Sequence, residues 1–396
     1  MGGPEIHIGD VGTQSVSIVA ASLNKASGLH LGPVKGANTL KVSGNTVEIV
    51  ASAKNVAKGV DAGKGADVTI GSSNAESVSI AGIKTGESQE GADEQAYGIF
   101  NVNQAQTKVY GKTVNVVAKG AKDTRAIHVA NNTEAQDKSA TLTIVGDEVC
   151  ITAESDDPDH STVGISAMSH GQVHITGNTV VTASDAIVAR GSSVVSINAD
   201  GRHYTQINGN VNFSYDAPTS GTSVDATVVL NLVGPESSWT GNMVVTWNGT
   251  PTNKDEYLSV TGMKLGLSKG AVWTPVETGH DSTTVTLGQK YTALNLLENN
   301  DGVINITDSA IDVTVEKMTG TGGTVNLAAD LTAEEGSQTG RITIDEADAN
   351  SKIDVKLKDA KMERNLTSDD LTAEKAKSLM DCLLYTSPSP RDMRRS

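Results

Sequence analysis

The sequence predicts an all-β protein and, within that class, a parallel β-helix, a solenoid whose short strands stack along one axis. Three observations support this prediction. A valine recurs at intervals of 31 to 36 residues, each interval holds three short apolar segments, and 40 glycines among 396 residues accompany only 3% aromatic residues. Repeats of this length cannot each bury an apolar face alone, but stacked repeats share one continuous core.

Each repeat begins with a short strand that ends at a small residue. Four of these strands read LKVSG, TKVYG, LTIVG and VHITG. A small side chain lets the backbone turn a corner without steric conflict. We therefore expect corners at a column of mostly small residues: Thr13, Gly44, Ala75, Gly111, Gly146 and Gly177.

The recurring valine lies in the second strand of each repeat. Residues two and four places later are mostly apolar or small, while the residue between is mostly polar, and this period of two sends alternate side chains to opposite faces. We expect Val47, Ile49, Val114, Val149 and Ile151 to be buried, and Glu48, Asn115 and Cys150 to be exposed. The predicted column is Val16, Val47, Val78, Val114, Val149, Val180 and Val211, with Thr182 and Ser184 following Val180 on the same face.

A third apolar segment completes each repeat. It is centred on Leu29, Val60, Ile99, Ile127, Ile165 and Ile187 in the first six repeats. Helical repeats of similar length would place apolar residues at i, i+3, i+4 and i+7, whereas here Val, Thr, Ile and Ser alternate. Three strands and three corners per repeat are therefore expected, around a narrow aliphatic interior.

The strict spacing covers residues 1–200, and residues 201–381 read as a continuing β-helix with longer loops. A separate β-sandwich in the second half is the alternative, because strands spaced 8 to 12 residues apart also suit that fold. Residues 382–396 contain CLLYTSPSPRD, which resembles a translated sequencing adapter. We interpret this tail as non-native and expect the natural protein to extend beyond residue 381 and before Met1.

Charge and hydropathy exclude several classes of function. The 31 basic and 47 acidic residues give a net charge of −16, which disfavours binding to nucleic acid or to anionic lipid. No apolar run approaches the roughly 20 residues of a membrane-spanning helix, so no membrane-spanning segment is expected. Two cysteines are too few for a disulfide framework.

Four segments of the second half carry a family resemblance. They are ESSWTGN at 236–242, LGLSKGAVWTP at 265–275, DGVINI at 301–306 and GTGGTVNLAAD at 320–330. In this order they resemble the passenger domain of bacterial autotransporters of the pertactin-like and AIDA-like kind. Where Val325 stands, the family usually has phenylalanine.

The resemblance implies a right-handed parallel β-helix exported through a C-terminal β-barrel translocator, which would belong to a missing C-terminal part. It also implies a location at the cell surface, anchored to the outer membrane or secreted, in a Gram-negative bacterium. An adhesin-like role is implied more often than catalysis. The expected partner is an unidentified ligand on a host cell, in mucus or on another bacterium.

One cluster has the residue types of acid-base or metal chemistry. Asp156, Asp157, Asp159 and His160 lie in SDDPDHS, and His170 and His174 follow shortly after. Paired carboxylates can hydrolyse glycosidic bonds, so these four residues of SDDPDHS are the candidate catalytic set. Against this reading, β-helix hydrolases also need a cationic pair on neighbouring turns, and Arg190 stands alone in the sequence.

Two further patterns are expected to be structural. AGKGADVTI at 62–70 partly fits a calcium-binding nonapeptide but lacks its first glycine pair and never repeats. Trp239, Trp247 and Trp273 are expected to pack inside the protein instead of being displayed for sugar stacking. We expect no metal and no cofactor.

The sequence therefore favours a non-catalytic surface scaffold over two alternatives. One alternative is a carbohydrate-active β-helix enzyme, a polysaccharide hydrolase or lyase. The other is a purely structural spacer. The ligand cannot be inferred from the fold, because specificity depends on the loops.

Overall fold

The computed structural model describes residues 5–10, 12–32, 38–87, 93–120, 122–131, 139–215, 226–247, 261–276, 291–308, 311–330 and 338–361. Within these ranges every regular element is a β-strand, so the prediction of an all-β protein is confirmed. No helix in this part of the chain has the length and apolar character needed to cross a membrane. The tail at 382–396 lies outside the described residues.

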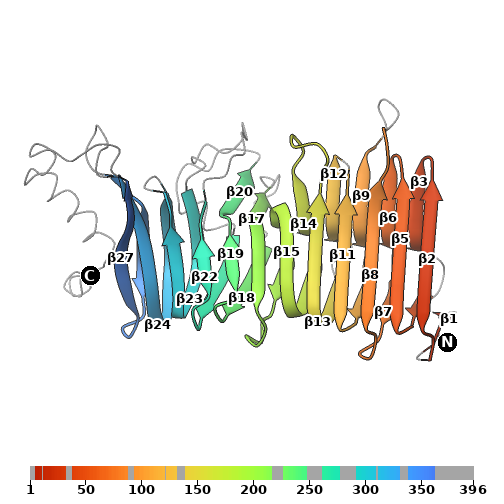
Figure 1. Ribbon diagram of the computed structural model, residues 1–396, viewed down its shortest axis with the longest axis horizontal. Helices are drawn as coiled ribbons and strands as arrows, with labels where there is room; N and C mark the ends of the chain where they lie inside the picture. The colour runs from red at the N-terminus through yellow and green to blue at the C-terminus, as the bar shows by residue number, and fades with distance from the viewer. Residues whose placement is uncertain are drawn as a thin grey trace, which may run out of the picture.

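The strands form three parallel ladders, and Figure 1 shows successive strands of a ladder side by side along the long axis, from the N-terminal end in red to the C-terminal end in blue. The first ladder contains β1 (Glu5–Ile8), β4 (Asn38–Val42), β7 (Ala66–Gly71), β10 (Gln106–Tyr110), β13 (Thr141–Glu154), β15 (Gln172–Arg190), β16 (Val194–Ile197), β18 (Ala226–Val233), β21 (Thr261–Ser268), β23 (Tyr291–Ile306), β24 (Asp312–Asp330) and β26 (Arg341–Ala347).

The second ladder contains β2 (Ser15–Ser22), β5 (Thr46–Ala53), β8 (Ser77–Lys84) and β11 (Thr113–Lys119), then the later parts of β13 and β15, then β17 (Thr205–Tyr215), β19 (Ser238–Thr240) and β22 (Val272–Thr274), and finally β23, β24 and β27 (Lys352–Lys361). The third contains β3 (Lys25–Leu31), β6 (Val56–Ala62), β9 (Gln95–Val102), β12 (Asp123–Ala130), β14 (Thr162–Met168), the ends of β15 and β17, and β20 (Met243–Trp247).

The chain visits the three ladders in order. β4, β5 and β6 follow one another in sequence, yet each pairs with the strand three places later: β7, β8 and β9. The long strands β13 and β15 run through corners and so contribute to more than one ladder. One passage through all three ladders is called a turn below.

The ladders continue past residue 200. β16 pairs in parallel with β18, and β17 pairs in parallel with both β19 and β20. Among the described pairings only β24 with the short β25 (Gln338–Thr339) is antiparallel. The parallel pairing of the strands beyond residue 200 differs from the antiparallel pairing in the sheets of a β-sandwich.

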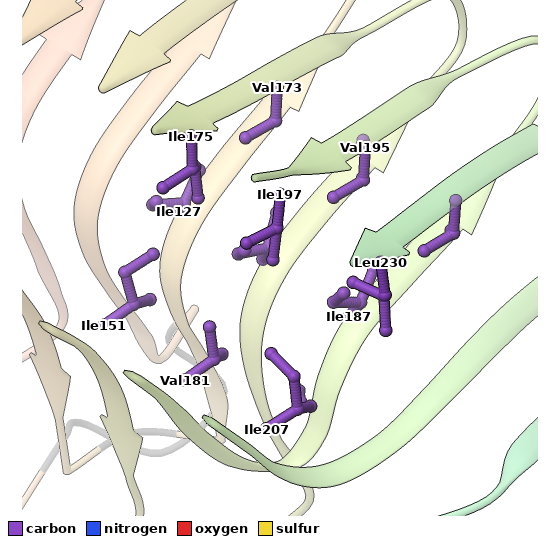
Figure 2. Packing of buried hydrophobic residues seen from close by; sticks show 14 of the residues in the cluster. Ile127, Ile151, Val173, Ile175, Val181, Ile187, Val195, Ile197, Ile207 and Leu230 are labelled. Carbon is purple, nitrogen blue, oxygen red and sulfur yellow. The ribbon is translucent and has the colours of Figure 1, made fainter. Parts of the chain in front are cut away.

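Inward side chains of all three ladders meet in one core. Figure 2 shows Ile175, Ile197 and Leu230 from the first ladder facing the same interior as Ile151 and Val181 from the second. Ile127 and Ile187 enter it from the third ladder. The five residues predicted to be buried, Val47, Ile49, Val114, Val149 and Ile151, are fully buried.

The side chains predicted to face outward do so, but not all of them are exposed. Glu48 is exposed, whereas Asn115 and Cys150 are half-buried. The reason is stacking: Asn115 lies between Ser79 and Cys150 of the neighbouring turns. Adjacent strands are about 4.8 Å apart, so each outward side chain is partly covered by those on either side.

The valine column is wrong at its last two positions. Val149 pairs with Thr179, not Val180, and Val180 instead lies opposite Cys150 on the outer face. The corner explains this shift, because two residues separate Val145 from Glu148 while Gly177 alone separates the paired residues Thr176 and Asn178. Val181 therefore enters the core, and Thr182 and Ser184 are exposed. Val211 belongs to the third ladder, opposite Ile187.

The tryptophans of β19 and β22 are internal, as expected. Trp239 and Trp273 are fully buried and stack with ring centroids 5.1 Å apart and planes 11° apart. Each indole N–H donates to a backbone carbonyl, Trp239 to Gly209 at 3.0 Å and Trp273 to Gly241 at 3.1 Å. The side chain of Trp247 lies outside the described residues.

Candidate functional site

A cleft of about 590 Å³ lies at the corner between the second and third ladders. Three successive turns build it, where β8, β11 and β13 end and the chain crosses to β9, β12 and β14. The corner loops of these turns stack, so residues far apart in sequence face the same space. The charged groups of the lining include Lys84, Glu94, Lys122, Asp156, Asp157 and His160.

Asp157 and His160 belong to a compact loop on one side of this cleft. Asp157 Oδ2 lies 2.8 Å from His160 Nδ1, and Asp157 Oδ1 accepts a hydrogen bond from the backbone N–H of Asp159 at 3.0 Å. The Asp159 N–H, followed by the His160 side chain, holds the pKa of Asp157 below its usual value. Both carboxylate oxygens of Asp157 thus contact groups of the same loop, the Asp159 N–H and the His160 ring.

Lysines from the two preceding turns face these acidic residues. Lys119 Nζ lies 3.5 Å from Glu154 and 4.0 Å from Asp156. Glu94 is shared by Lys84 and Lys122, each at 3.4 Å. The sequence pattern offers only Arg190 as a candidate cation, because these lysines precede Asp156 by one or two turns and carry no local motif.

The structure divides the predicted cluster between corners. Asp156, Asp157 and His160 line the cleft, while Asp159 contributes its backbone N–H to the turn. His170 lies in the turn after β14, and His174 lies on β15 opposite Thr143 and Ser196 in the first ladder. The two later histidines therefore belong to another part of the surface, because the chain turns a corner between them and Asp157.

Glycoside hydrolysis requires a feature that Asp157 lacks. One carboxyl must stay protonated near neutral pH to act as the general acid, which demands a raised pKa. The pKa of Asp157 is shifted the other way, and its side chain is about half exposed. The nearby lysines stabilise ionised carboxylates further. The cleft is therefore better suited to ion pairing than to proton donation.

A second polar cluster, which sequence analysis also missed, lies on the outer face of the third ladder. Phe100 stacks on His128 at 5.1 Å and contacts Tyr97 at 5.1 Å, and Lys58 Nζ lies 3.5 Å from the centre of the Phe100 ring. The Tyr97 hydroxyl donates to Asp123. Register explains the contacts, because Asp61, Phe100, His128 and Ser166 are direct neighbours on β6, β9, β12 and β14.

Arg125 connects this network. It donates from Nε to Asp123 at 2.7 Å and from Nη1 to Ser166 Oγ at 3.1 Å, and Nη1 also lies 3.2 Å from His128 Nδ1. Arginine can only donate, so Nδ1 of His128 accepts and the imidazole is neutral. Burial, followed by the charge of Arg125, lowers the pKa of His128 to about 3.

The His128 network is a poor candidate for nucleophilic catalysis. Ser166 Oγ lies 3.2 Å from His128 Nδ1, a distance typical of a nucleophile and its base. However, Ser166 is fully buried, so a substrate cannot reach its hydroxyl. A histidine with a pKa of about 3 is also a weak base at neutral pH. The contacts of this cluster stabilise the outer face of the third ladder.

The segment that partly fits a calcium motif gathers few possible ligands. Asp67 is its only carboxylate, and Asp61, which immediately precedes the segment, pairs with His30 at 2.9 Å and with Lys58 at 3.5 Å. In the described part of the chain, no three His, Cys, Asp or Glu side chains come together in a way that could hold a metal ion.

No protein-family model matches the chain, and neither a curated protein nor a solved structure matches it.

Proposed function

We propose that the chain is a right-handed parallel β-helix whose three ladders are the faces of one coil. Two observations support this proposal. Strands pair in parallel with the strand three places later in the most regular part, from β1 to β11. Side chains from all three ladders also enter one core. Such repetition lets each turn be stabilised by its neighbours.

We further propose that the coil is part of an autotransporter passenger domain. The observation that carries this proposal is the position of the four resembling segments. They occupy successive turns, and Trp239, Trp273, Ile304 and Val325 are direct neighbours in one inward column of the second ladder. Four fragments that are individually weak thus recur at one structural position, which favours a common repeat.

The proposed role is adhesion without catalysis, at the surface of a Gram-negative bacterium or after secretion. The partner would be a ligand on a host cell, in mucus or on another bacterium. The state of Asp157 supports a non-catalytic role, since its carboxylate is tied to its own turn and its pKa is lowered. In this proposal residues 1–200 and 201–381 are the regular and less regular parts of one scaffold.

A carbohydrate-active enzyme is the second candidate. The cleft favours an enzyme in one respect, because Asp156, Asp157, His160 and Lys122 line one space of about 590 Å³. A structural spacer is the third, and it predicts neither binding nor turnover.

Two assays on the same purified protein separate these roles. Beads coated with the protein are expected to adhere to epithelial cells, mucin or bacteria, while a panel of polysaccharides releases no new reducing ends. Turnover that disappears in the Asp156→Ala, Asp157→Ala double variant would establish the enzyme instead. Absence of both adhesion and turnover would leave the spacer.

A further inference from the structure

A groove with a different chemistry lies at the corner between the third and first ladders. It has a volume of about 440 Å³ and is built by four successive turns, where the chain enters β7, β10, β13 and β15. We call this groove the amide groove. Its polar side chains are those of Asp67, Gln104, Gln106, Ser139, Thr141 and Gln172.

The described lining of the groove carries little charge in a strongly acidic protein. Among the described residues that line it, Asp67 is the only charged side chain, and the other polar side chains are amides and hydroxyls. A single carboxylate supplies at most two of the six or more oxygen ligands that a calcium ion takes. No basic side chain is among the described residues of the lining, which disfavours a phosphate or sulfate ligand. A neutral ligand rich in hydroxyl groups fits the lining best.

Internal hydrogen bonds fix how the amides are presented. Gln106 Nε2 donates to the carbonyl of Ser139 at 2.8 Å and to that of Gln104 at 3.5 Å, and Gln172 Nε2 donates to Ser139 Oγ at 3.1 Å. The donors of Gln106 are therefore used, while no donor from the described part of the chain binds the side-chain oxygens of Gln106 and Gln172. The Ser139 hydroxyl accepts from Gln172 and keeps its own proton to donate.

The spacing of the groove matches a chain of sugars. Asp67, Gln106, Thr141 and Gln172 are direct neighbours in the register of the first ladder. Neighbouring strands are about 4.8 Å apart, so the four positions span about 14 Å. One pyranose unit of a β-1,4-linked chain advances by a distance similar to the spacing between two neighbouring strands. Each turn can therefore offer one polar group to each sugar.

We propose that the amide groove binds a neutral oligosaccharide, whose hydroxyl groups donate to Asp67, Gln106 and Gln172 and accept from Ser139. This inference rests on the proposed binding role and gives it a site and a ligand class. None of the described residues that line the groove is aromatic, so no sugar stacking is expected from them and single-site affinity is expected in the millimolar range. Repeated contacts on a surface would compensate for this weakness.

Saturation-transfer NMR with four neutral tetrasaccharides tests the proposal. The probes are the β-1,4-linked oligomers of glucose, mannose, xylose and N-acetylglucosamine. At least one is expected to bind, and Gln106→Ala combined with Gln172→Ala should weaken it at least about tenfold. The matched control is Gln206→Ala on β17, whose amide also donates to a carbonyl of the next turn, that of Glu236, at 2.9 Å but lies outside the groove.

Asp67→Asn provides a second variant that spares the fold, because the carboxylate of Asp67 is exposed. Several-fold weaker binding is expected, since one acceptor becomes a donor. The proposal is overturned if no probe binds at millimolar concentration, or if binding is equal in the protein and in both groove variants. It is also overturned if calcium alone raises the melting temperature, Asp67→Asn abolishes that rise and no sugar binds.

These outcomes are distinguishable from failure of the proposed function. Bead adhesion that persists in the groove variants would reject the groove and leave adhesion standing. Sugar binding accompanied by release of reducing ends would reject the non-catalytic role and leave the groove standing.

Discussion

Cys150 lies on the outer face of the second ladder, between Asn115 and Val180 of the neighbouring turns. Burial of the thiol, followed by the negative charge of Glu148, raises its pKa. Alkylation by iodoacetamide in the native protein should therefore proceed, but with a rate profile displaced to higher pH than that of the unfolded chain. Complete protection of Cys150 would mean that its side chain points inward and that the register of the second ladder is wrong.

Gly177 occupies the corner at which the repeat loses one residue. Its φ is +132°, and a Cβ there would lie 2.0 Å from the carbonyl oxygen of Gly146. Gly177→Ala should lower the free energy of unfolding by about 3 kcal/mol or more, since backbone strain and a backbone clash combine. Chemical denaturation measures this loss.

Gly234 is the matched control for that substitution. Its φ is +88°, but no atom lies within 4 Å of the position that a Cβ would occupy. Gly234→Ala should cost about 1 kcal/mol through backbone strain alone. Equal losses in the two variants would show that the corner at Gly177 relaxes and does not fix the register.

At the scale of elements, the buried network on β9, β12 and β14 makes the third ladder sensitive to acid. His128 has a pKa of about 3 in the folded protein and about 6.5 when unfolded. Below pH 6.5 the unfolded chain therefore binds a proton that the folded chain does not. The stability contributed by neutral His128 is fully present above pH 6.5 and is lost as pH falls towards 3.

The size of this effect follows from linkage. Each pH unit below 6.5 costs about 1.4 kcal/mol, so the protein should lose about 2 kcal/mol between pH 6.5 and 5 relative to His128→Asn. Urea unfolding of both proteins at the two pH values measures the difference. Identical pH dependence in the two proteins would show that His128 is protonated or solvated in the folded state.

Elements with an inflexible local pattern could be predicted from the sequence. The centres of the third apolar segment, from Leu29 to Ile187, are direct neighbours in the third ladder, as predicted for all six repeats. A glycine or alanine precedes each of these residues and marks its place. The valine column failed at Val180 because the length of a corner is not encoded in the strand that follows. A one-residue change there moves the side chains of the strand segment that follows, from Asn178 to Thr182, to the other face.

The candidate cleft could be predicted only in part for the same reason. Asp156, Asp157 and His160 are adjacent in the sequence, so their proximity needs no tertiary information. Lys84 and Lys122 reach the same cleft only because three corners stack. Conversely, His174 is close to Asp157 in sequence but lies on a different ladder, since a strand and a corner separate them.

At the scale of the whole molecule, the repeat should tolerate removal of one complete turn. Deleting residues 47–77 places Val78 where Val47 was, and both residues lie in the register of Val16. The third ladder then pairs Leu29 with Ile99, and the first pairs Val42 with Val109. Because each turn contacts mainly its neighbours, the shortened protein should keep its circular dichroism spectrum and a cooperative melting transition.

A half-turn deletion is the control for this experiment. Removing residues 47–61 takes out most of β5 and β6, so the chain passes from the corner after β4 directly to β7, and Lys64 falls at the core position of Ile49. This protein should fail to fold cooperatively. If the two deletions are equally damaging, the turns are not interchangeable and the proposed coil is incorrect.

The direction of the hydrogen bonds between turns has a mechanical consequence. They run along the long axis of Figure 1, because strands in a ladder are bonded perpendicular to their length. Tension applied between the two ends would therefore load successive turns in series, and the weakest turn would yield first while the others stay intact. Val16 and Val47 mark a turn of 31 residues, so each rupture would release about 100 Å of chain. The molecule would extend in discrete steps under load and would absorb a sudden pull one turn at a time.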